Sequence, residues 1–436
     1  MKIVLFIMDT RLLEFPKIEI NRYVPELDIL NNPIFNIKEK EFLAEFYEYM
    51  EENLEKDLKN LEELNYSAEE PIQERKSEIV ANFMKKLAEK GYYSTVIDFD
   101  EHEVGNVSRN ALIALALCGG FWSPNSDRYV NGNWSIEMGR LSGGTLYCNP
   151  VNYKANEYQR EKYLIPVIKN GLMAASAMTE FNAGSDIVRI ETRLDDQGDK
   201  VIANGKKLFI TNGMLAENII LYGRLNSGRL GGIIVDTEHQ QLKNYESSRV
   251  RTFGMNDAFV SRLVFNDVEL PKENLLEGDG LDIMFHQLTE ERLVISAEAI
   301  GDSIKKLFYT HSFALQREQF QHKLHQYQII RFPIAKNIRA INLYLSALIN
   351  YAREIDKRSQ ISSSKMMANQ VMGLKIQTCE LAFQSSIDLF RTMGGRAFTE
   401  QYCNQFGLLD AHCMVHGGGS HYVLGDAESR RFFKTK

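Results

Sequence analysis

Apolar residues recur at spacings of three and four over long parts of the chain, which is the pattern of amphipathic helices. The first such stretch, residues 39–90, is highly charged, and its charged face is interpreted as solvent-exposed surface. The apolar positions in its first half are Phe42, Phe46, Tyr49, Met50, Leu54, Leu58 and Leu61. Further helical patterns cover residues 111–118, 134–146, 283–317, 327–357 and 363–393, and a last one starts near residue 407.

A different pattern lies in the middle of the chain, where short segments rich in β-branched and aromatic residues alternate with turns. The segments are residues 173–178, 187–192, 200–203, 207–210, 219–222, 230–235 and 261–265. Turn-forming pairs such as Asn204-Gly205 and Asn212-Gly213 separate them. The pattern predicts a β-meander or small β-barrel between two helical regions. We therefore expect an α+β chain with an N-terminal extension (1–35), a helical domain (36–171), a β domain (172–282) and a C-terminal helical bundle (283–436).

Composition narrows the class of protein. The chain has 436 residues, 44% of them apolar and 25% charged, as in ordinary globular proteins. Its formal charge of −7 argues against a general nucleic-acid binder or a protein that binds anionic membranes. No apolar run approaches the roughly 20 residues of a membrane span. The five cysteines are widely spaced and form no C-x-x-C pair, which favours reduced thiols and a cytoplasmic location.

Short motifs then follow one another in a fixed order. Residues 177–186 read AMTEFNAGSD, residues 207–213 KLFITNG and residues 260–276 VSRLVFNDVELPKENLL. Residues 291–294 read ERLV, residues 317–320 REQF and residues 393–395 MGG. In this order the motifs resemble the signatures of the acyl-CoA dehydrogenase family. The resemblance implies that family's fold, with a helical N-terminal domain, a middle β-barrel and a C-terminal four-helix bundle, and it implies FAD as the cofactor.

The resemblance also implies roles for residues of the β domain. Met178 and Thr179 are expected to contact the flavin ring, since small residues and strand-end amides allow a close approach of the backbone. Phe209 and Thr211 are expected on the other side of the ring, with Phe209 where the family usually has Trp. Ser185 is expected near the diphosphate or the pantetheine arm of the substrate.

A second set of residues is expected at the cofactor's diphosphate. By resemblance, Arg317 reaches the diphosphate of a neighbouring subunit, because its planar guanidinium matches phosphate oxygens. The other residues expected to bind the cofactor are Gln319, Phe320, Gln328, Arg391, Gly395 and Ser420. Arg391 replaces the family's Gln, and Gln321 stands where the family has Gly. The resemblance implies a homodimer or homotetramer.

The family's usual catalytic base is missing. Most members have a Glu in a C-terminal segment of the form RDAxxxxxxEGT, but residues 409–420 read LDAHCMVHGGGS and place Gly418 at that position. A minority branch, which includes isovaleryl- and long-chain-acyl-CoA dehydrogenases, takes its base from the ER motif. Glu291 aligns with that alternative and is our candidate base, with a pKa raised by burial. Two other interpretations remain open: a structural ion pair at Glu291, or another group as the base. Arg292, Gly418 and Ser185 are expected at the substrate, and Gly418 is hypothesised to leave room for an α-substituent.

These residues predict a FAD-dependent dehydrogenase that desaturates an acyl thioester carried by CoA or by an acyl or peptidyl carrier protein, in specialised metabolism. The electron acceptor would be an electron-transfer flavoprotein or oxygen. Two alternatives share the fold: a flavin-dependent monooxygenase and a degenerate, non-catalytic partner protein. His412, His416 and His421 have spacings that also occur in metal sites, but they are interpreted as packing residues, and no metal is expected.

Overall fold

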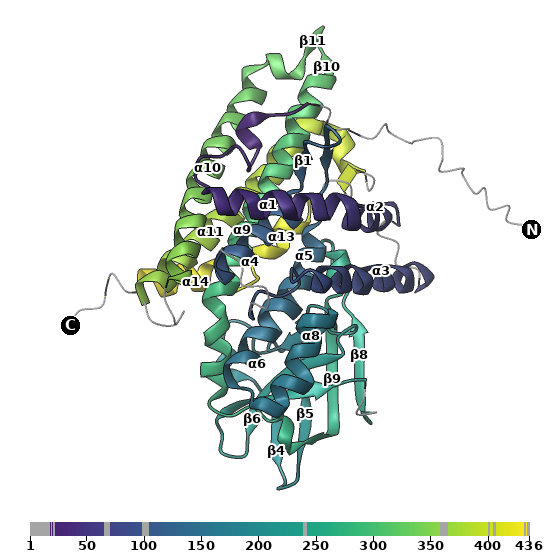
Figure 1. Ribbon diagram of the computed structural model, residues 1–436, viewed down its shortest axis with the longest axis vertical. Helices are drawn as coiled ribbons and strands as arrows, with labels where there is room; N and C mark the ends of the chain where they lie inside the picture. The colour runs from purple at the N-terminus through teal and green to yellow at the C-terminus, as the bar shows by residue number, and fades with distance from the viewer. Residues whose placement is uncertain are drawn as a thin grey trace, which may run out of the picture.

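Helices, a sheet and further helices follow one another along the chain (Figure 1). The computed structural model describes residues 18, 20, 22–64, 70–97, 104–238, 242–357, 365–399, 402–403, 407–430 and 433. The sheet lies at one end of the molecule, at the bottom of Figure 1. The hairpin that follows the longest helix lies at the opposite end, at the top. None of the helices in these ranges is long and apolar enough to cross a bilayer.

The N-terminal region consists of several helices where the pattern of residues 39–90 suggested a continuous amphipathic stretch. They are α1 (Ile37–Tyr49), α2 (Glu55–Glu63) and α3 (Glu70–Glu89). The separate helical pattern at residues 111–118 lies in α4 (Asn106–Gly119). Asn36 and Glu39 form a capping box at the start of α1, which satisfies two backbone N–H groups there. Helix α4 is buried on all sides, and from Ala111 to Cys118 its sequence is apolar throughout.

Between α4 and the sheet lie a β-hairpin and four short helices. The hairpin pairs β1 (Phe121–Ser123) with β2 (Arg128–Val130). The helices are α5 (Trp134–Arg140), α6 (Cys148–Lys154), α7 (Glu157–Gln159) and α8 (Ile165–Asn170). Figure 1 shows α6 and α8 in front of the sheet.

The middle region is a sheet of seven strands. They are β3 (Ala174–Ala177), β4 (Arg193–Asp196), β5 (Lys200–Ile210), β6 (Asn218–Leu225), β7 (Leu230–Asp236), β8 (Tyr245–Arg249) and β9 (Ser261–Pro271). The pairing order is β3-β6-β4-β5-β9-β8, with β7 also on β6. The simple meander was wrong, because β6 pairs in parallel with both β3 and β4.

Two strand predictions need correction. The segment 187–192 is not a strand: Ile187–Arg189 form a single 3-10 turn, and β4 begins after it. The segments 200–203 and 207–210 belong to one strand, β5, which is interrupted by irregularities in its pairing with β9. Strand β8 was not predicted, because its sequence, YESSR, is polar and mostly exposed at the edge of the sheet.

The C-terminal region is built around α9 (Gly280–Gln316), which is buried along most of its length. It packs against α4, α10 (Gln328–Asp356) and α11 (Lys365–Met393). The hairpin of β10 (Glu318–Gln319) and β11 (His322–Lys323) connects α9 to α10. Two short helices, α13 (Asp410–Met414) and α14 (His421–Ser429), lie against α11. Helix α9 therefore links the sheet to the far end of the bundle.

Candidate active site

Glu291 is a buried carboxylate on α9 that has no hydrogen-bond partner for one of its oxygens. Only 6% of the residue is exposed. Its Oε2 atom is buried and unpaired among the described residues. Burial raises the pKa of Glu291 to about 7, although the charges of Arg292 and Lys375 act in the opposite direction. A carboxylate with such a pKa can accept a proton near neutral pH.

The turn at residues 417–419 lies against this carboxylate. Gly418 has a φ of 63° and Gly419 a φ of 103°, both in the region that favours glycine. A Cβ atom at Gly418 would lie 2.9 Å from Ile295 Cδ1 and 3.8 Å from Glu291 Cδ. A side chain at position 418 would therefore point to the place that Glu291 and Ile295 fill. The room for an α-substituent beside Gly418 stays a prediction.

Two cationic side chains hold this turn. Arg292 Nε donates a hydrogen bond to the carbonyl oxygen of Gly418 at 2.9 Å. Lys375 Nζ, which comes from α11, donates to the carbonyl oxygen of Gly419 at 3.0 Å. Arg292 therefore anchors the turn through Nε, while its charge also acts on its neighbour Glu291. The structural interpretation of the ER motif as a simple Glu–Arg pair has no contact to support it in this part of the chain.

Met178 connects the end of β3 to the same face of α9. Gln287 lies one helical turn before Glu291, so the two side chains share a face of the helix. Its Nε2 atom lies 3.9 Å from the sulfur of Met178. Its Oε1 atom is buried and has no hydrogen-bond partner among the residues described. Next along the chain, the carbonyl oxygen of Thr179 accepts a hydrogen bond from Leu208 N at 2.9 Å, which joins this corner to β5.

Phe209 is unusually placed for a large aromatic residue. It lies in the irregular part of β5, with a φ of 59°, and it is 60% exposed. Positive φ values are rare for bulky residues and often mark strained functional positions. Thr211, two residues further on, is half-buried, and its carbonyl oxygen accepts a hydrogen bond from Ser142 Oγ at 3.1 Å. Phe209 lies in β5 and Thr211 directly follows it, so both are close in sequence to Leu208, which bonds to Thr179.

The glutamate of the AMTE motif has a structural role in the chain. Glu180 accepts hydrogen bonds from Glu191 N and Thr192 N, and it forms a buried ion pair of 2.7 Å with Lys207. Burial lowers the pKa of Lys207 to about 8 even though Glu180 acts to raise it. The pair fixes the loop after Met178 and Thr179 to β5.

Replacing Lys207 by Met is expected to destabilise the protein by about 3 kcal/mol or more, because it leaves the Glu180 carboxylate buried without its cation. Urea unfolding measures the effect. Lys200→Met is the matched control on the same strand, since Lys200 pairs with Glu269 at 2.7 Å in the solvent and its loss should change little. Equal shifts in the two variants would contradict this account.

The residues expected at the diphosphate lie elsewhere, at the far end of α9. Arg317 follows the last residue of that helix, 26 positions after Glu291, which is about 39 Å along a helix. Phe320 is 89% exposed at the tip of the hairpin, with a φ of 51°, and Gln321 beside it has a φ of 63°. Gln319 and Gln328 are exposed nearby in the sequence. Within one chain, these residues are not brought together with Glu291.

Arg391 and Gly395 lie at the same end as Arg317. The last turns of α9 and α11 share a small apolar cluster that includes Phe313, Leu389 and Met393. Arg391 and Gly395, on either side of Met393, are exposed, and a Cβ atom at Gly395 would meet nothing within 4 Å. The candidate residues thus form two groups, one around Glu291 and one at the C-terminal end of α9.

The remaining candidates are more peripheral. Ser185 is exposed in the loop after Thr179. Ser420 precedes α14 and is half-buried. His412 packs edge-on against Phe383, and His421 Nδ1 lies 2.9 Å from Glu380. Across the described ranges, no group of three or more His, Cys, Asp or Glu residues is placed to hold a metal ion.

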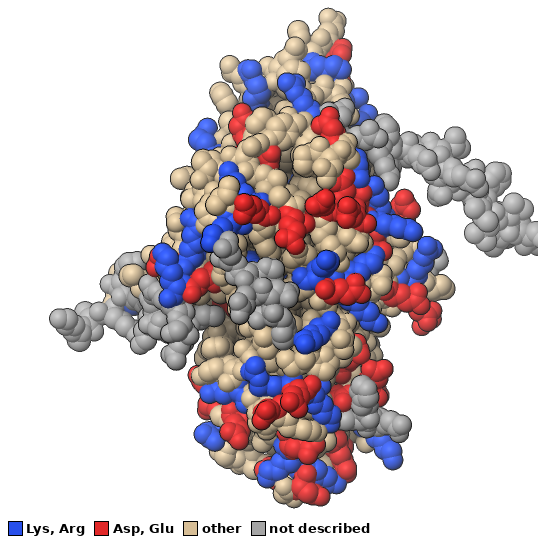
Figure 2. Space-filling view, in the orientation of Figure 1, with Lys and Arg blue, Asp and Glu red and all other residues tan. Residues whose placement is uncertain are grey.

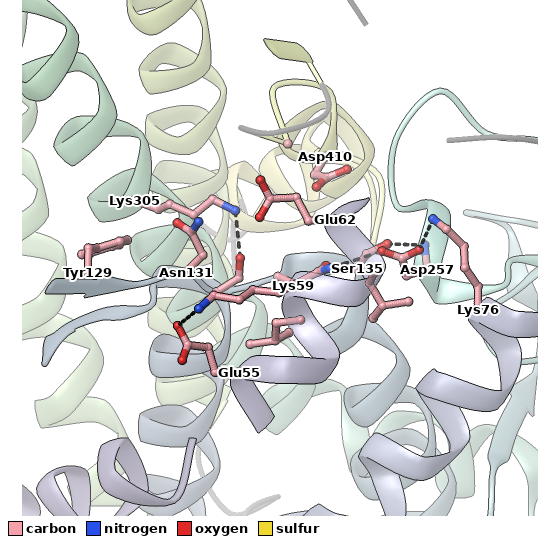
Figure 3. Close-up of a pocket in the computed structure, with 15 residues that line it drawn as sticks. Glu55, Lys59, Glu62, Lys76, Tyr129, Asn131, Ser135, Asp257, Lys305 and Asp410 are labelled. Carbon is pink, nitrogen blue, oxygen red and sulfur yellow. Dashed lines mark hydrogen bonds and ion pairs between the residues drawn. The ribbon is translucent and has the colours of Figure 1, made fainter. Parts of the chain in front are cut away.

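A separate polar cavity of about 100 Å³ lies between α2, α3, α9 and the segment before α13 (Figure 3). Lys76 and Asp257 form an ion pair of 2.8 Å in its wall, and Lys305 and Asp410 face it from the C-terminal region. Lys305 is 14 residues beyond Glu291 on α9, about 21 Å along the helix. The cavity is therefore distinct from the Glu291 site.

The residues around Met178 fit a flavin ring. A flavin offers hydrogen-bonding atoms along one edge and a flat aromatic surface. The site supplies a buried oxygen without a partner among the described residues, Gln287 Oε1, and the Nε2 atom of the same side chain lies 3.9 Å from the sulfur of Met178. The exposed Phe209 supplies an aromatic surface close in sequence to the β5 link. These unsatisfied and exposed groups are what a bound planar, polar-edged group would cover.

Two contributors to this site were not predicted from the sequence. Gln287 could have been found from its spacing of four residues before Glu291 on one helix. Lys375 gave no local signal, because it belongs to α11 and reaches the glycine turn only in the folded chain.

Comparisons with known proteins agree with this geometry. The acyl-CoA dehydrogenase middle domain matches residues 175–268, and the acyl-CoA dehydrogenase C-terminal domain matches residues 278–432. Together these matches cover more than half of the chain. The protein belongs to the acyl-CoA dehydrogenase family.

Individual relatives are distant. Isovaleryl-CoA dehydrogenase of Arabidopsis thaliana mitochondria is 28% identical over 306 residues, 69% of this chain and 73% of the relative. The 2-methylacyl-CoA dehydrogenase of Solanum tuberosum mitochondria is 26% identical over 280 residues, 63% of this chain and 66% of the relative. Two solved structures share the fold. An acyl-CoA dehydrogenase from Geobacillus kaustophilus has a TM-score of 0.77 at 20% identity, covering 92% of this chain and 99% of its own. PigA with FAD and proline has a TM-score of 0.76 at 19% identity, covering 92% and 98%.

Proposed function

We propose that this protein desaturates an acyl thioester between its α- and β-carbons, with Glu291 as the base that removes the α-proton. As a member of its family, the chain is an oxidoreductase that acts on CH–CH bonds with FAD as its cofactor. The single observation that carries the proposal for Glu291 is its place: it fills the space toward which a side chain at Gly418 would point.

The residues of the site have separate roles in proton removal, flavin binding and the exclusion of water. Glu291 Oε2, which is buried and unpaired among the described residues, takes the α-proton of the thioester. Met178, Thr179, Phe209, Thr211 and Gln287 hold the flavin ring, which when bound accepts the hydride from the β-carbon. The surrounding apolar side chains and the closed glycine turn keep water from Glu291, which strengthens the electrostatic interactions there.

We place the diphosphate of FAD at the second group of residues, in a neighbouring subunit. The separation of Arg317 from Glu291 along α9 supports this arrangement, because one α9 cannot present both ends to one ring and its diphosphate. Apolar side chains near Arg317 are exposed, namely Phe320, Ile329 at 80% and Phe332 at 67%. Exposed apolar surface of this kind favours an interface between subunits, so we propose a homodimer or homotetramer.

For the substrate, we propose a branched or cyclic acyl group on CoA or on a carrier protein. The relatives in the comparison are named for isovaleryl-CoA and 2-methylacyl-CoA, both branched, and PigA was solved with proline. Specialised metabolism remains our proposal for the setting. Charged groups of both signs are interspersed over the face in Figure 2, without a single-sign patch there that would indicate one class of carrier.

The remaining partners are also proposals. The electron acceptor is proposed to be an electron-transfer flavoprotein or oxygen. We propose a cytoplasmic location because the five cysteines form no disulfide bond.

Anaerobic titration of the flavin-loaded protein tests the proposed function. We expect the visible flavin band to bleach with a branched acyl thioester, presented either as CoA ester or on a carrier protein, and to bleach less with butyryl-CoA. A flavin that stays oxidised with every thioester, but supports oxygen-dependent hydroxylation after chemical reduction, would favour the monooxygenase. A protein that binds no FAD would favour the non-catalytic alternative.

A further inference from the structure

The glycine turn over Glu291 is closed by hydrogen bonds to two successive carbonyl groups. Arg292 Nε binds the carbonyl of Gly418 at 2.9 Å and Lys375 Nζ binds that of Gly419 at 3.0 Å. The two cations come from different helices, α9 and α11, so the turn is held from two sides. Because Gly418 and Gly419 have no side chains to anchor them, these two bonds fix the backbone of the turn.

The burial of Lys375 at this turn is energetically unfavourable. Its side chain is fully buried, and burying an ammonium group without compensating charge is strongly unfavourable. Burial lowers the pKa of Lys375, while Cys379, Glu291 and Glu380 act to raise it. Glu380 is exposed and lies against His421, whereas Glu291 is buried. The main buried carboxylate that offsets the charge of Lys375 is therefore Glu291.

We propose that Lys375 is a positioning residue, whose ammonium group holds the Gly419 carbonyl so that the turn stays closed over Glu291 and whose charge favours the ionised form of that carboxylate. This role rests on the proposed function of Glu291 as the base. Lys375 acts through Glu291 and the turn, without contacting the reacting atoms.

The charged groups around Glu291 determine whether its pKa rises or falls when Lys375 is removed. On α9 they are Arg292, which favours the ionised carboxylate, and Glu298, which is itself buried and interacts unfavourably with Glu291. From α11 comes Lys375. The turn at residues 417–419 adds no titratable side chain. Among the described residues, removal of Lys375 leaves Arg292 as the cation that acts on Glu291, so the pKa of Glu291 must rise.

Infrared titration of the flavin-loaded protein measures this directly and needs no substrate. The carboxyl band of Glu291 is assigned by its loss in Glu291→Gln. We expect its midpoint to move upward by at least about half a pH unit in Lys375→Met. Lys375→Arg, which keeps the charge and a donor, should restore the midpoint. Lys336→Met, at an exposed lysine on α10, is the control and should leave it unchanged.

An unchanged midpoint in folded Lys375→Met would overturn the proposal. If that variant does not fold, Lys375→Gln keeps an N–H donor without the charge and must also raise the midpoint. The pH dependence of anaerobic flavin reduction should shift by the same amount in each variant. If no thioester reduces the wild-type flavin, the proposed function fails, whereas the infrared midpoints still decide whether Lys375 controls the ionisation of Glu291.

Discussion

Glu291→Gln is expected to slow anaerobic flavin reduction by at least about 100-fold, while FAD content and folding stay intact. The physical reason is that a positioned base contributes roughly 10²–10⁴-fold, and an amide of the same shape cannot accept the α-proton. Rapid mixing of the flavin-loaded protein with a thioester that bleaches the wild type measures the rate. An effect below about threefold would remove Glu291 from the reaction.

Glu290→Gln is the matched control for this variant. Glu290 is the preceding residue on α9 and is also buried, but its carboxylate accepts hydrogen bonds from Asn110 at 2.7 Å and Asn149 at 2.9 Å. It therefore has a structural environment in which both oxygens are satisfied. We expect Glu290→Gln to affect stability more than the rate of flavin reduction, which is the reverse of the pattern for Glu291→Gln.

The second large expected effect is the dependence of the rate of flavin reduction on pH. Because the pKa of Glu291 is raised to about 7 and only the ionised form accepts a proton, flavin reduction should rise with pH and level off above this value. Below it, the rate should fall about tenfold for each pH unit. The rate measured between pH 5 and 9 checks this. A flat profile, or one with its midpoint near the ordinary pKa of a glutamate, would contradict the buried environment.

Stability should depend on pH in the opposite direction. A carboxyl group whose pKa is raised in the folded protein binds a proton there more tightly than in the unfolded chain. Its contribution is therefore most favourable below the unfolded value, and it is lost as pH rises toward 7. Glu291→Gln should be more stable than the wild type at pH 8, and this advantage should vanish near pH 4.5.

The helices were the most predictable part of this fold, because α9, α10 and α11 have long apolar faces that sequence spacing shows directly. The strands were less predictable. The parallel pairing of β6 with β3 and β4 depends on contacts between distant segments, and polar β8 is a strand only because β9 lies beside it. The run from Ile187 was apolar enough to suggest a strand but forms a turn before β4.

The site residues that belong to a sequence motif could be predicted. Those that reach the site from distant segments only in the folded chain could not. The glycine at position 418 and the glutamate at position 291 could be noted separately in the sequence, but their proximity is a property of the folded chain. Lys375 comes from a third segment, and only its hydrogen bond to the carbonyl of Gly419 identifies it as part of the site. The division of the candidates into a ring group and a diphosphate group, by contrast, was already implied by the family resemblance, and the structure adds that Arg317 lies 26 positions after Glu291.

Proton exchange at the α-carbon tests the central claim most directly. Phenylacetyl-CoA has α-hydrogens but no β-hydrogen to give up, so it isolates the step that Glu291 performs. In deuterated buffer near pH 8, the wild type should introduce deuterium at the α-carbon, and Glu291→Gln should do so at least about 100-fold more slowly. Equal exchange by the two proteins would show that another group removes the proton.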